Sequence, residues 1–477
     1  MYDVAVIGAG IVGAACAWRL SRCKLNVVLL EKENDVCMGT TRANSAIIHA
    51  GYDPKPGTLM AKLNVRGNAL CKEICKKLDA PLKETGSLVL AFDDEECEEV
   101  RALFARGQQN GVPGLEIWDT QKILQKEPNV AKNVKLALWA PTAAIVNPWE
   151  MGLAMAETAV RNGCTLHRSF PVTKIEKTDG GYTLHSGNVA VRARYVISAC
   201  GVHADEVRSM VSPAPYKIIP TAGEYYLLDK SEGKTVSSVV FQCPSKKGKG
   251  VLVAPTVHGN LIVGPTATLK DDRDDTANTA AGMREIREKA VKSVPGVNFR
   301  QNIRNFSGVR ANSTADDFVI EFADKNFLDI AGIRSPGLTA APAIAEQAAE
   351  MLFAAGLPNE EKEHYIDSRT HIHFNTLDEK AQQEIVQKNP LYGRVICRCE
   401  TVTEGEIVEA IHSPVPPCSV DGIKRRTGTG MGRCQGGFCG PRVLEILARE
   451  TETPQTEILQ DAQDSYILTG ETKTEEK

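Results

Sequence analysis

The sequence predicts an α/β fold with a parallel sheet at the N-terminus, combined with an α+β domain and followed by a small cysteine-rich domain. Three observations carry this prediction. A β-branched strand runs directly into a glycine-rich turn and a helix within residues 3–20. Strand-like and helical stretches then alternate through residues 52–150 and 210–320. Five of the fourteen cysteines fall between Cys397 and Cys439, which indicates a separate module.

Length and composition limit the number of domains and the class of protein. At 477 residues the chain can form two or three domains, and its 42% apolar and 24% charged residues are typical of a globular protein. The net charge of −4 gives no electrostatic argument for binding nucleic acid or an anionic membrane. No apolar run approaches the roughly 18–20 residues of a membrane span, and we expect no signal peptide, because Met1 leads straight into a strand. We expect a cytoplasmic protein with at most peripheral membrane association through partners.

The first thirty residues have the order of a dinucleotide-binding βαβ unit. The strand at 3–7 leads into Gly8-Ala-Gly10-Ile-Val-Gly13, then a helix to residue 20 and a second strand at 26–30. The glycines permit a tight turn and a close backbone approach to a pyrophosphate, and an acid after the second strand can bind a ribose. A glycine-rich turn in another kind of α/β protein is the alternative. The expected contacts are Gly8, Gly10, Ile11, Val12, Gly13, Glu31 and Lys32.

The segments after Glu31 favour FAD over NAD. A polar loop at 39–45, a strand ending at 199–201 and a strand-turn-helix segment at 327–351 could all face one cofactor, although they are far apart in the chain. An NAD-binding domain forms its whole site within one continuous stretch of chain. No second G-x-G-x-x-G lies between a strand and a helix, so a separate NAD(P)H site is not expected. The additional contacts expected for FAD are Thr40, Thr41, Arg42, Asn44, Ser45, Ala199, Cys200, Gly201, Gly332, Pro336, Gly337, Leu338 and Thr339.

These segments resemble the D-amino-acid-oxidase-like FAD-dependent oxidoreductases over about residues 1–355. The resemblance implies an FAD-binding Rossmann-like domain with an α+β substrate domain, and it places Val172 on the strand that contacts the adenine. No cysteine or histidine stands out as a covalent anchor for the flavin, so we expect non-covalent FAD. Residues 44–51, 223–226 and 308–311 look most like the L-2-hydroxyglutarate dehydrogenases, and the layout is similar to the large subunit of anaerobic glycerol-3-phosphate dehydrogenases. Those dehydrogenases share a lysine where this chain has Gly337, which leaves a hydroxycarboxylate open as the substrate.

The cysteine module contains two close pairs. Cys397 and Cys399 are separated from Cys434 and Cys439 by 34 intervening residues, and a helix is expected at 404–411. Four thiolates in two pairs suit an iron–sulfur cluster or a metal, while zinc ribbons usually place two residues between paired cysteines. Zinc and an empty redox dithiol are the alternatives, and Cys418 is expected off the cluster. The run from Cys397 to Cys439 resembles the bacterioferritin-associated-ferredoxin-like [2Fe–2S] domain, which implies these four cysteines as ligands.

The expected domain boundaries follow from these assignments. The FAD-dependent oxidoreductase spans 1–358, with FAD-binding segments at about 1–50, 145–210 and 325–358 and a substrate domain at about 51–144 and 211–324. A connector at 359–392, a cluster domain at 393–450 and a tail at 451–477 follow. A basic loop at 246–249 could steer an anionic substrate.

Four side chains are candidates for the chemistry at the flavin. His49 follows the flavin loop and is the candidate base, with a structural histidine bonded to the backbone as the alternative. Arg310 can grip a carboxylate or phosphate bidentately unless it is a surface arginine. Tyr225, or its neighbour Tyr226, could donate to the same anion or simply lie in the core, and Arg334 is a possible second cation.

The leading hypothesis is an FAD/[2Fe–2S] dehydrogenase of a small anionic hydroxy compound, either glycerol 3-phosphate or a 2-hydroxy acid. Because a cluster carries single electrons away from flavin, we expect electron-accepting partner subunits in a hetero-oligomeric complex. Two alternatives stay open. One is an amine or amino-acid dehydrogenase of the proline or opine type, and the other is an electron-relay subunit without a substrate of its own.

Overall fold

The computed structural model describes residues 1–244 and 250–470, which form two compact units. The basic loop at 246–249 and the last residues of the tail, 471–477, lie outside the described residues. The first unit comprises Met1–Leu30, Cys37–Leu166 and Val172–Ser368. The second comprises Glu31–Val36, His167–Pro171 and the chain from Arg369 onward, so the expected connector at 359–392 is divided at Ser368.

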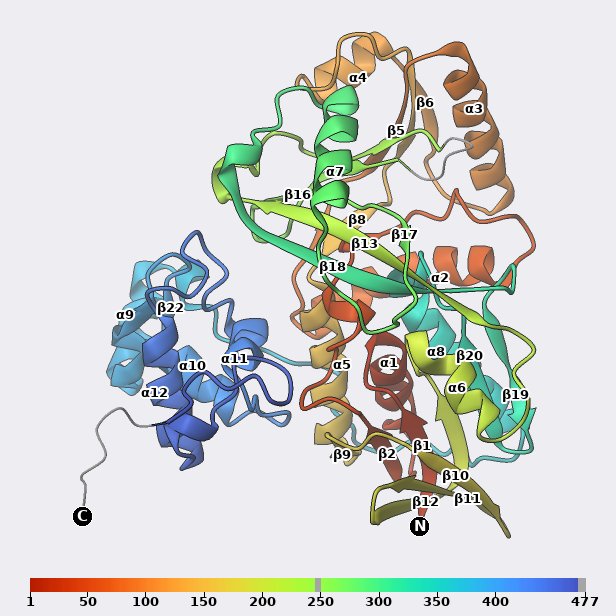
Figure 1. Ribbon diagram of the computed structural model, residues 1–477, viewed down its shortest axis with the longest axis vertical. Helices are drawn as coiled ribbons and strands as arrows, with labels where there is room; N and C mark the ends of the chain where they lie inside the picture. Colours follow the sequence, from red (N-terminus) through yellow and green to blue (C-terminus); the bar gives the residue numbers. More distant parts are fainter. Residues whose placement is uncertain (245–249, 471–477) are drawn as a thin grey trace. The chain divides into compact units, whose positions relative to one another are not determined.

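The dinucleotide-type sheet of the first unit has its parallel strands where the sequence predicts them. Strand β1 pairs in parallel with β2 on one side and β12 on the other, and β20 continues the sheet beyond β12 (Figure 1). Val4, Ala5 and Val6 of β1 are fully buried, as a central parallel strand requires. The strands of this sheet are β1 (Tyr2–Ile7), β2 (Val27–Leu30), β9 (Thr165–His167), β10 (Lys174–Thr178), β11 (Gly181–Ser186), β12 (Val189–Ser198), β19 (Val319–Asp324) and β20 (Phe327–Ala331).

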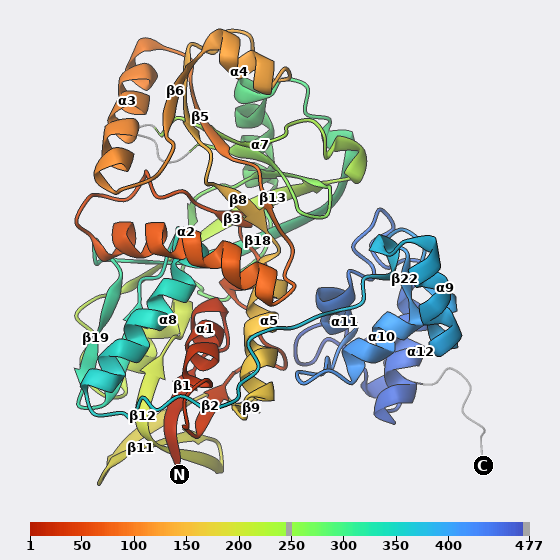
Figure 2. The same cartoon turned by 180° about the vertical axis from the view of Figure 1, so that it is seen from behind.

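The helices beside this sheet are rich in small residues that permit close packing. Helix α1 packs against α5 and α8, and α8 also packs against α2 (Figure 2). Ala14, Ala15 and Ala17 of α1 are fully buried. Residues 59–78 have the apolar periodicity of a helix, and α2 covers all of this stretch except its last residue. The helices are α1 (Ile11–Leu20), α2 (Leu59–Lys77), α5 (Pro148–Arg161), α6 (Ala204–Ser209) and α8 (Gly337–Ala354).

A second, mainly antiparallel sheet is built from the segments expected to form the substrate domain. Its longest pair joins β13 and β18, with Tyr225 opposite Phe306 and Thr221 opposite Arg310. A buried core of Leu, Val and Ile side chains lies between this sheet and helices α4 and α7. The strands are β5 (Ser87–Ala91), β6 (Glu116–Asp119), β7 (Leu136–Ala140), β13 (Ile218–Leu228), β14 (Val239–Gln242), β15 (Leu252–Pro255), β16 (Leu261–Gly264), β17 (Thr268–Leu269) and β18 (Asn302–Ser313).

The remaining elements of the first unit are short. Strand β8 lies between β3 and β4 in a separate small sheet, which leads the chain from the first sheet toward the second. These elements are β3 (Ile47–Ile48), β4 (Leu82–Glu84), β8 (Ala144–Val146), α3 (Asp94–Gln109), α4 (Thr120–Lys126), α7 (Ala280–Ser293), and the 3-10 turns η1 (Thr40–Arg42), η2 (Gly201–His203), η3 (Lys230–Glu232) and η4 (Phe299–Gln301).

The second unit is a small helical body with one two-stranded sheet. Helix α10 matches the helix predicted over 404–411, and Thr403 and Glu406 cap its N-terminus reciprocally. Leucine, isoleucine and valine side chains from α10 and α12 form its core together with Cys397 and Cys439. The elements are η5 (Phe374–Thr376), α9 (Glu379–Lys388), η6 (Pro390–Gly393), β21 (Val395–Cys397), β22 (Val402–Thr403), α10 (Glu404–Ile411), α11 (Val420–Thr427), α12 (Gly440–Thr451) and η7 (Gln455–Glu457).

Part of the expected tail packs into this unit. Ile458 is buried in the core, and Leu459 forms a bridge with Ser419 and another with Tyr466. The apolar residues at 458–459 interrupt the polar composition of the tail and explain why this stretch folds back. Among the residues that the structure describes, no helix is long and apolar enough to cross a membrane.

A buried ion pair organises the second unit around Asp35. Arg426 binds both carboxylate oxygens of Asp35 at 2.8 Å, and Arg425 donates to Asp35 Oδ2 at 3.0 Å and to Asp461 at 2.6 Å. Burial alone would raise the pKa of Asp35, but the two guanidinium groups outweigh it and hold that pKa well below its ordinary value. The carboxylate is therefore charged and paired at neutral pH.

Candidate functional site

The glycine-rich turn after β1 has no room for side chains. Gly8 has a φ of +94°, and a Cβ there would lie 2.6 Å from the carbonyl oxygen of Ala199. A Cβ on Gly13 would lie 1.8 Å from the oxygen of Gly8. The N–H of Ala199 donates to the carbonyl of Ile7 at 2.9 Å. The structure therefore brings the predicted segments at 8–13 and 199–201 together at one edge of the sheet.

The N-terminus of α1 lies beside the predicted polar loop. Its N-cap is Gly10, which supplies no capping side chain. The N–H of Ile11 donates to Thr41 Oγ1 at 2.9 Å, which places the predicted polar loop beside this helix end, and Val12 follows in the buried first turn. Free helix N–H groups and the positive end of the helix dipole favour an anionic ligand here.

The residues expected at the adenosine end lie on three segments. Glu31 directly follows β2, is largely buried, and accepts a 3.0 Å hydrogen bond from the N–H of Glu33. Lys32 is exposed. Val172 lies two residues before β10 and outside any strand, whereas the resemblance placed it on one. Glu31 thus directly follows the second strand of the βαβ unit, as the sequence predicts.

The polar loop at 39–46 is fixed against β18. Asn44 Nδ2 donates to the carbonyls of Thr40 and Thr41, and Thr40 Oγ1 donates to the carbonyl of Val309 at 2.6 Å. A Cβ on Gly308 would lie 1.9 Å from the carbonyl oxygen of Ala43, so the two backbones touch. Arg42 donates to Met38 Sδ at 3.8 Å. The hydrogen bond from Thr40 brings Val309, the residue before Arg310, to the loop that is expected to line the flavin.

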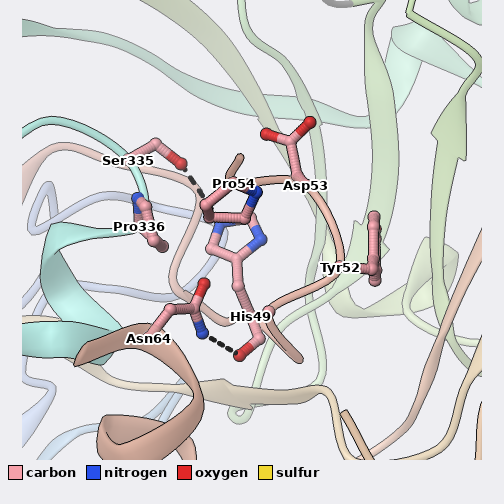
Figure 3. Close-up of a pocket in the computed structure, with 8 residues that line it drawn as sticks. His49, Tyr52, Asp53, Pro54, Asn64, Ser335 and Pro336 are labelled. Carbon is pink, nitrogen blue, oxygen red and sulfur yellow. Dashed lines mark hydrogen bonds between the residues drawn. The ribbon is translucent and has the colours of Figure 1, made fainter. Parts of the chain in front are cut away.

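His49 follows β3 and is held through its backbone on both sides. Its N–H donates to Thr339 Oγ1 at 2.9 Å, and its carbonyl accepts from Asn64 Nδ2 at 2.8 Å and Asn68 Nδ2 at 3.1 Å. Its ring Nε2 lies 3.4 Å from Ser335 Oγ (Figure 3). The predicted base and the predicted flavin-side turn at 335–339 are therefore adjacent.

Asn64 and Asn68 were not predicted as site residues. They lie four positions apart on α2, and both are buried. Two asparagines on the buried face of an amphipathic helix are a signal that the sequence offers, because a buried amide needs a partner. What the sequence does not tell is that this partner is the carbonyl of His49.

A small pocket that is open to solvent lies beside the His49 ring (Figure 3). Ser335 and Pro336 of the last flavin-side turn line one side of it, and the loop after His49 lines the other. The lining residues are His49, Gly51, Tyr52, Asp53, Pro54, Asn64, Ser335 and Pro336. The candidate base thus faces a space formed by segments that are far apart in the sequence.

Tyr225 and Arg310 lie on the neighbouring strands β13 and β18. The Tyr225 hydroxyl is 3.0 Å from Ser45 Oγ, and its ring stacks on Phe306 with centroids 4.8 Å apart. Tyr226 points the other way, toward the carbonyl of Met283. Arg310 is half-buried and donates to the carbonyl of Thr266 at 3.2 Å. Tyr225, rather than Tyr226, therefore reaches the flavin loop.

Arg334 and the glycines near it shape the last turn. Arg334 donates to the carbonyl of Asp316 at 2.9 Å, while its neighbour Ser335 lines the pocket. Gly332 has a φ of +63°, which suits a glycine at the end of β20. A Cβ on Gly337 would lie 2.6 Å from Ile333 Cγ2, so the turn has little room for a larger residue there. Leu338 and Thr339 begin α8 immediately afterwards.

The four cysteines of the second unit form two pairs. Cys397 and Cys439 are buried, whereas Cys399 and Cys434 are exposed with their sulfur atoms 3.7 Å apart. A hydrogen bond from the Cys439 thiol lowers the pKa of Cys397 to about 6, and the N–H of Phe438 lowers the pKa of Cys434. A donor set of four cysteines in two close pairs fits an iron–sulfur cluster. Cys418 lies off the pairs and donates to the carbonyl of Asn34.

Comparison with known proteins identifies both parts of the chain. A family model described as FAD dependent oxidoreductase matches residues 3–351, and one described as BFD-like [2Fe-2S] binding domain matches residues 395–449. The predicted cofactors, FAD and a [2Fe–2S] cluster, are confirmed, as is the predicted fold class.

Three individual proteins show how far the similarity extends. A glycerol 3-phosphate dehydrogenase of Caloramator mitchellensis is 50% identical over 478 residues, which cover 100% of both chains. A mitochondrial L-2-hydroxyglutarate dehydrogenase of Mus musculus is 29% identical over 72% of this chain and 87% of its own. The L-alpha-glycerophosphate oxidase of Mycoplasma pneumoniae with FAD bound superposes with a TM-score of 0.73 at 30% identity, over 77% of this chain and 98% of its own.

Proposed function

Because the chain belongs to the FAD-dependent oxidoreductase family, we propose that it oxidises glycerol 3-phosphate and passes the electrons through a [2Fe–2S] cluster to a partner protein. The observation that carries this proposal is the 50% identity to a glycerol 3-phosphate dehydrogenase, which extends over the whole chain and so includes the cluster domain. We place the protein in the cytoplasm as one subunit of a hetero-oligomeric complex.

The residues around the β1 turn would hold FAD without a covalent bond. Gly8, Gly10 and Gly13 leave the backbone open to the pyrophosphate, and Glu31 would accept from the ribose hydroxyls. The loop at 40–45 and the turn at 336–339 would face the flavin. When bound, FAD supplies the acceptor for a hydride, which is two electrons and one proton, from the substrate carbon.

His49 would take the proton from the substrate hydroxyl. As the carbon loses its hydride, the O–H bond breaks, its electron pair forms the C=O bond, and the proton moves to the imidazole. Ser335, 3.4 Å from Nε2, would help to orient the ring. The hydrogen bonds from Asn64 and Asn68 and to Thr339 would fix the backbone of His49, so that the imidazole stays aimed at the pocket.

Arg310 would bind the phosphate of the substrate. Arg310 lies on β18 next to Val309, whose carbonyl accepts from Thr40 of the flavin loop. A planar guanidinium binds phosphate or carboxylate bidentately. Tyr225 would donate to the same anion or hold Ser45 in place, and Arg334 would supply a second positive charge. Gly337 contributes no cation, so the charge must come from these arginines.

Cys397, Cys399, Cys434 and Cys439 would bind the cluster. When bound, the [2Fe–2S] cluster supplies a one-electron carrier, which matches a two-electron oxidation to a one-electron acceptor. The exposed pair, Cys399 and Cys434, would give that acceptor access to the cluster.

A substrate panel tests the proposed reaction. The purified holoprotein is mixed anaerobically with glycerol 3-phosphate, L-2-hydroxyglutarate, L-lactate and L-proline in turn, and loss of the oxidised-flavin absorbance is followed. Glycerol 3-phosphate should reduce the flavin at least tenfold faster than the others, a difference of about 1.4 kcal/mol in the barrier.

The other outcomes point to specific alternatives. Faster reduction by L-2-hydroxyglutarate would favour a hydroxycarboxylate dehydrogenase, for which the neutral Gly337 and the similarity to the Mus musculus enzyme give some support. Reduction by L-proline alone would favour an amino-acid dehydrogenase. Flavin that stays oxidised with all four compounds would favour a relay subunit.

A further inference from the structure

The surface around the exposed cysteines carries an aromatic ring and a cation in contact. Phe438 is 60% exposed, more than any other aromatic side chain among the described residues. The guanidinium carbon of Arg398 lies 4.9 Å from the centroid of the Phe438 ring. Burying an exposed phenylalanine is favourable, so this ring offers apolar area to a molecule that docks beside the ligand loops.

This pair is continuous in sequence with the cluster ligands. Arg398 precedes Cys399, and Phe438 precedes Cys439, so both side chains are carried by the two ligand loops. Cys399 and Cys434 are exposed on the same loops, whereas Cys397 and Cys439 are buried. We call the surface formed by Arg398, Cys399, Cys434 and Phe438 the cluster-edge patch.

The charge of the patch indicates the kind of partner. Arg398 is exposed, and its cation lies over the aromatic ring rather than against a carboxylate in the described part of the second unit. Arg433 is also exposed and directly precedes Cys434, whereas Arg442 lies on α12 and pairs with Glu445 at 2.8 Å. Arginine and aromatic residues are the types enriched at protein interfaces, and a basic edge attracts a surface of opposite charge.

We propose that the cluster-edge patch docks the electron-accepting protein, and that this acceptor surrounds its own redox group with carboxylates. Electron transfer is the passage of one electron from the reduced cluster to the oxidised acceptor, with no bond made or broken. This inference rests on the proposed exit of electrons through the cluster, but it does not depend on which substrate reduces the flavin. An anionic membrane could also attract an arginine and a phenylalanine, and we favour a protein because the patch contains the exposed cluster ligands themselves.

The test uses two cytochromes as probes. The holoprotein is reduced photochemically, without substrate, and mixed with either the soluble domain of cytochrome b5, which has an acidic haem edge, or cytochrome c, which has a basic one. The second-order rate of haem reduction is measured from about 0.02 M to about 0.2 M salt, because surface attraction is screened over this range. Variants are compared at equal cluster content, determined from the EPR signal of the reduced cluster.

The expected results separate the patch from the rest of the surface. Cytochrome b5 should react faster than cytochrome c at low salt, and its rate should fall as salt rises. Arg398→Glu should lower the cytochrome b5 rate about tenfold at low salt, and Phe438→Ala should lower it about threefold at all salt concentrations. The matched controls, Arg192→Glu on β12 and Phe322→Ala on β19, should change it less than twofold, because both residues are exposed in the first unit.

Two results would overturn the proposal. One is an equal effect of Arg398→Glu and Arg192→Glu on the cytochrome b5 rate. The other is binding of the wild-type protein to phosphatidylserine vesicles that Arg398→Glu abolishes while both cytochrome rates stay unchanged, which would assign the patch to a membrane. Because reduction is photochemical, failure of glycerol 3-phosphate as a substrate would leave these outcomes unaffected.

Discussion

The side-chain amide of Asn64 donates a 2.8 Å hydrogen bond to the backbone carbonyl of His49, the proposed base. Asn68, one helical turn further along α2, donates to the same oxygen at 3.1 Å. Both asparagines are buried, and the N–H of His49 is bonded to Thr339 on α8. Two helices therefore fix the backbone at the residue that must present a proton acceptor to the substrate.

Removing the side-chain amides of both Asn64 and Asn68 should raise the barrier to flavin reduction by more than the sum of the two single effects. In Asn64→Ala or Asn68→Ala the carbonyl keeps one donor, and we expect flavin reduction to slow about threefold. In the double variant the carbonyl loses both of these donors, which costs about 1–3 kcal/mol, and we expect a loss of more than thirtyfold in kcat with little change in KM. Single-turnover flavin reduction by stopped flow measures the coupling.

The control for these variants is Asn129→Ala, which removes an amide donor to the carbonyl of Thr235 on the far side of the second sheet. It should leave the rate of flavin reduction unchanged. Additive losses in the double variant, or equal losses in Asn129→Ala, would show that the two asparagines do not act through His49.

His49→Ala should lower the rate of flavin reduction by about 10²–10⁴, the usual contribution of a general base. Bound FAD should stay at wild-type content, because His49 contacts the turn at 335–339 and not the glycine-rich turn. Stopped-flow absorbance gives the rate, and the flavin content after gel filtration gives the binding. A rate within threefold of wild type would contradict the role of His49 as the base.

Arg310→Ala should raise KM for glycerol 3-phosphate by about 10–100-fold, since a hydrogen-bonded charge contributes about 1.5–3 kcal/mol. Arg310→Lys should recover only part of this loss, because an ammonium cannot bind two oxygens in the plane of a guanidinium. Arg304→Ala, on the same strand and exposed, is the matched control. A similar KM in Arg310→Ala and Arg304→Ala would remove Arg310 from the substrate site.

Asp35→Asn should destabilise the second unit by about 3–5 kcal/mol at pH 7, because it leaves two buried arginines without their shared carboxylate. The folded pKa of Asp35 is depressed, so its contribution is fully present above the unfolded pKa of about 3.9 and is lost as pH falls through the lower folded value. Between about pH 5 and pH 3 the wild-type protein should therefore lose more stability than Asp35→Asn.

The stability of the second unit is measured as the free energy of opening of α11. This value comes from hydrogen exchange of α11 peptides, corrected for the intrinsic pH dependence of exchange. Asp421→Asn, on the same helix and half-buried, is the control and should change it by less than 1 kcal/mol. Equal pH slopes for the wild-type protein and Asp35→Asn would mean that Asp35 is not the group that titrates.

Short sequence patterns predict those parts of the protein whose structure is determined by residues close together in the chain. The glycines at 8–13 follow from the strand before them and the helix after them, and the helices at 59–77 and 404–411 follow from apolar periodicity. The two cysteine pairs are recognisable by spacing alone. For the glycines and the two helices, the determining contacts lie within a few turns of chain, whereas the contact between Cys399 and Cys434 joins the two predicted pairs across 35 residues.

Long-range contacts account for what the sequence does not predict. The rotation of α2 that turns Asn64 toward His49 depends on its packing against α8, about 270 residues later. The pairing of Asp35 with Arg425 and Arg426 spans about 390 residues, and the sequence around Asp35 does not predict it. Likewise, Ile458 lies in a tail of largely polar composition, and only the core that it enters explains its burial.

Anaerobic addition of glycerol 3-phosphate to the holoprotein, with the flavin absorbance and the cluster EPR signal followed in one sample, tests the central claim most directly. The account predicts that the flavin bleaches and that the signal of the reduced cluster appears. In Cys434→Ser the flavin should still bleach but the cluster signal should be absent. Flavin that stays oxidised with glycerol 3-phosphate, in a sample that dithionite reduces fully, would contradict the account.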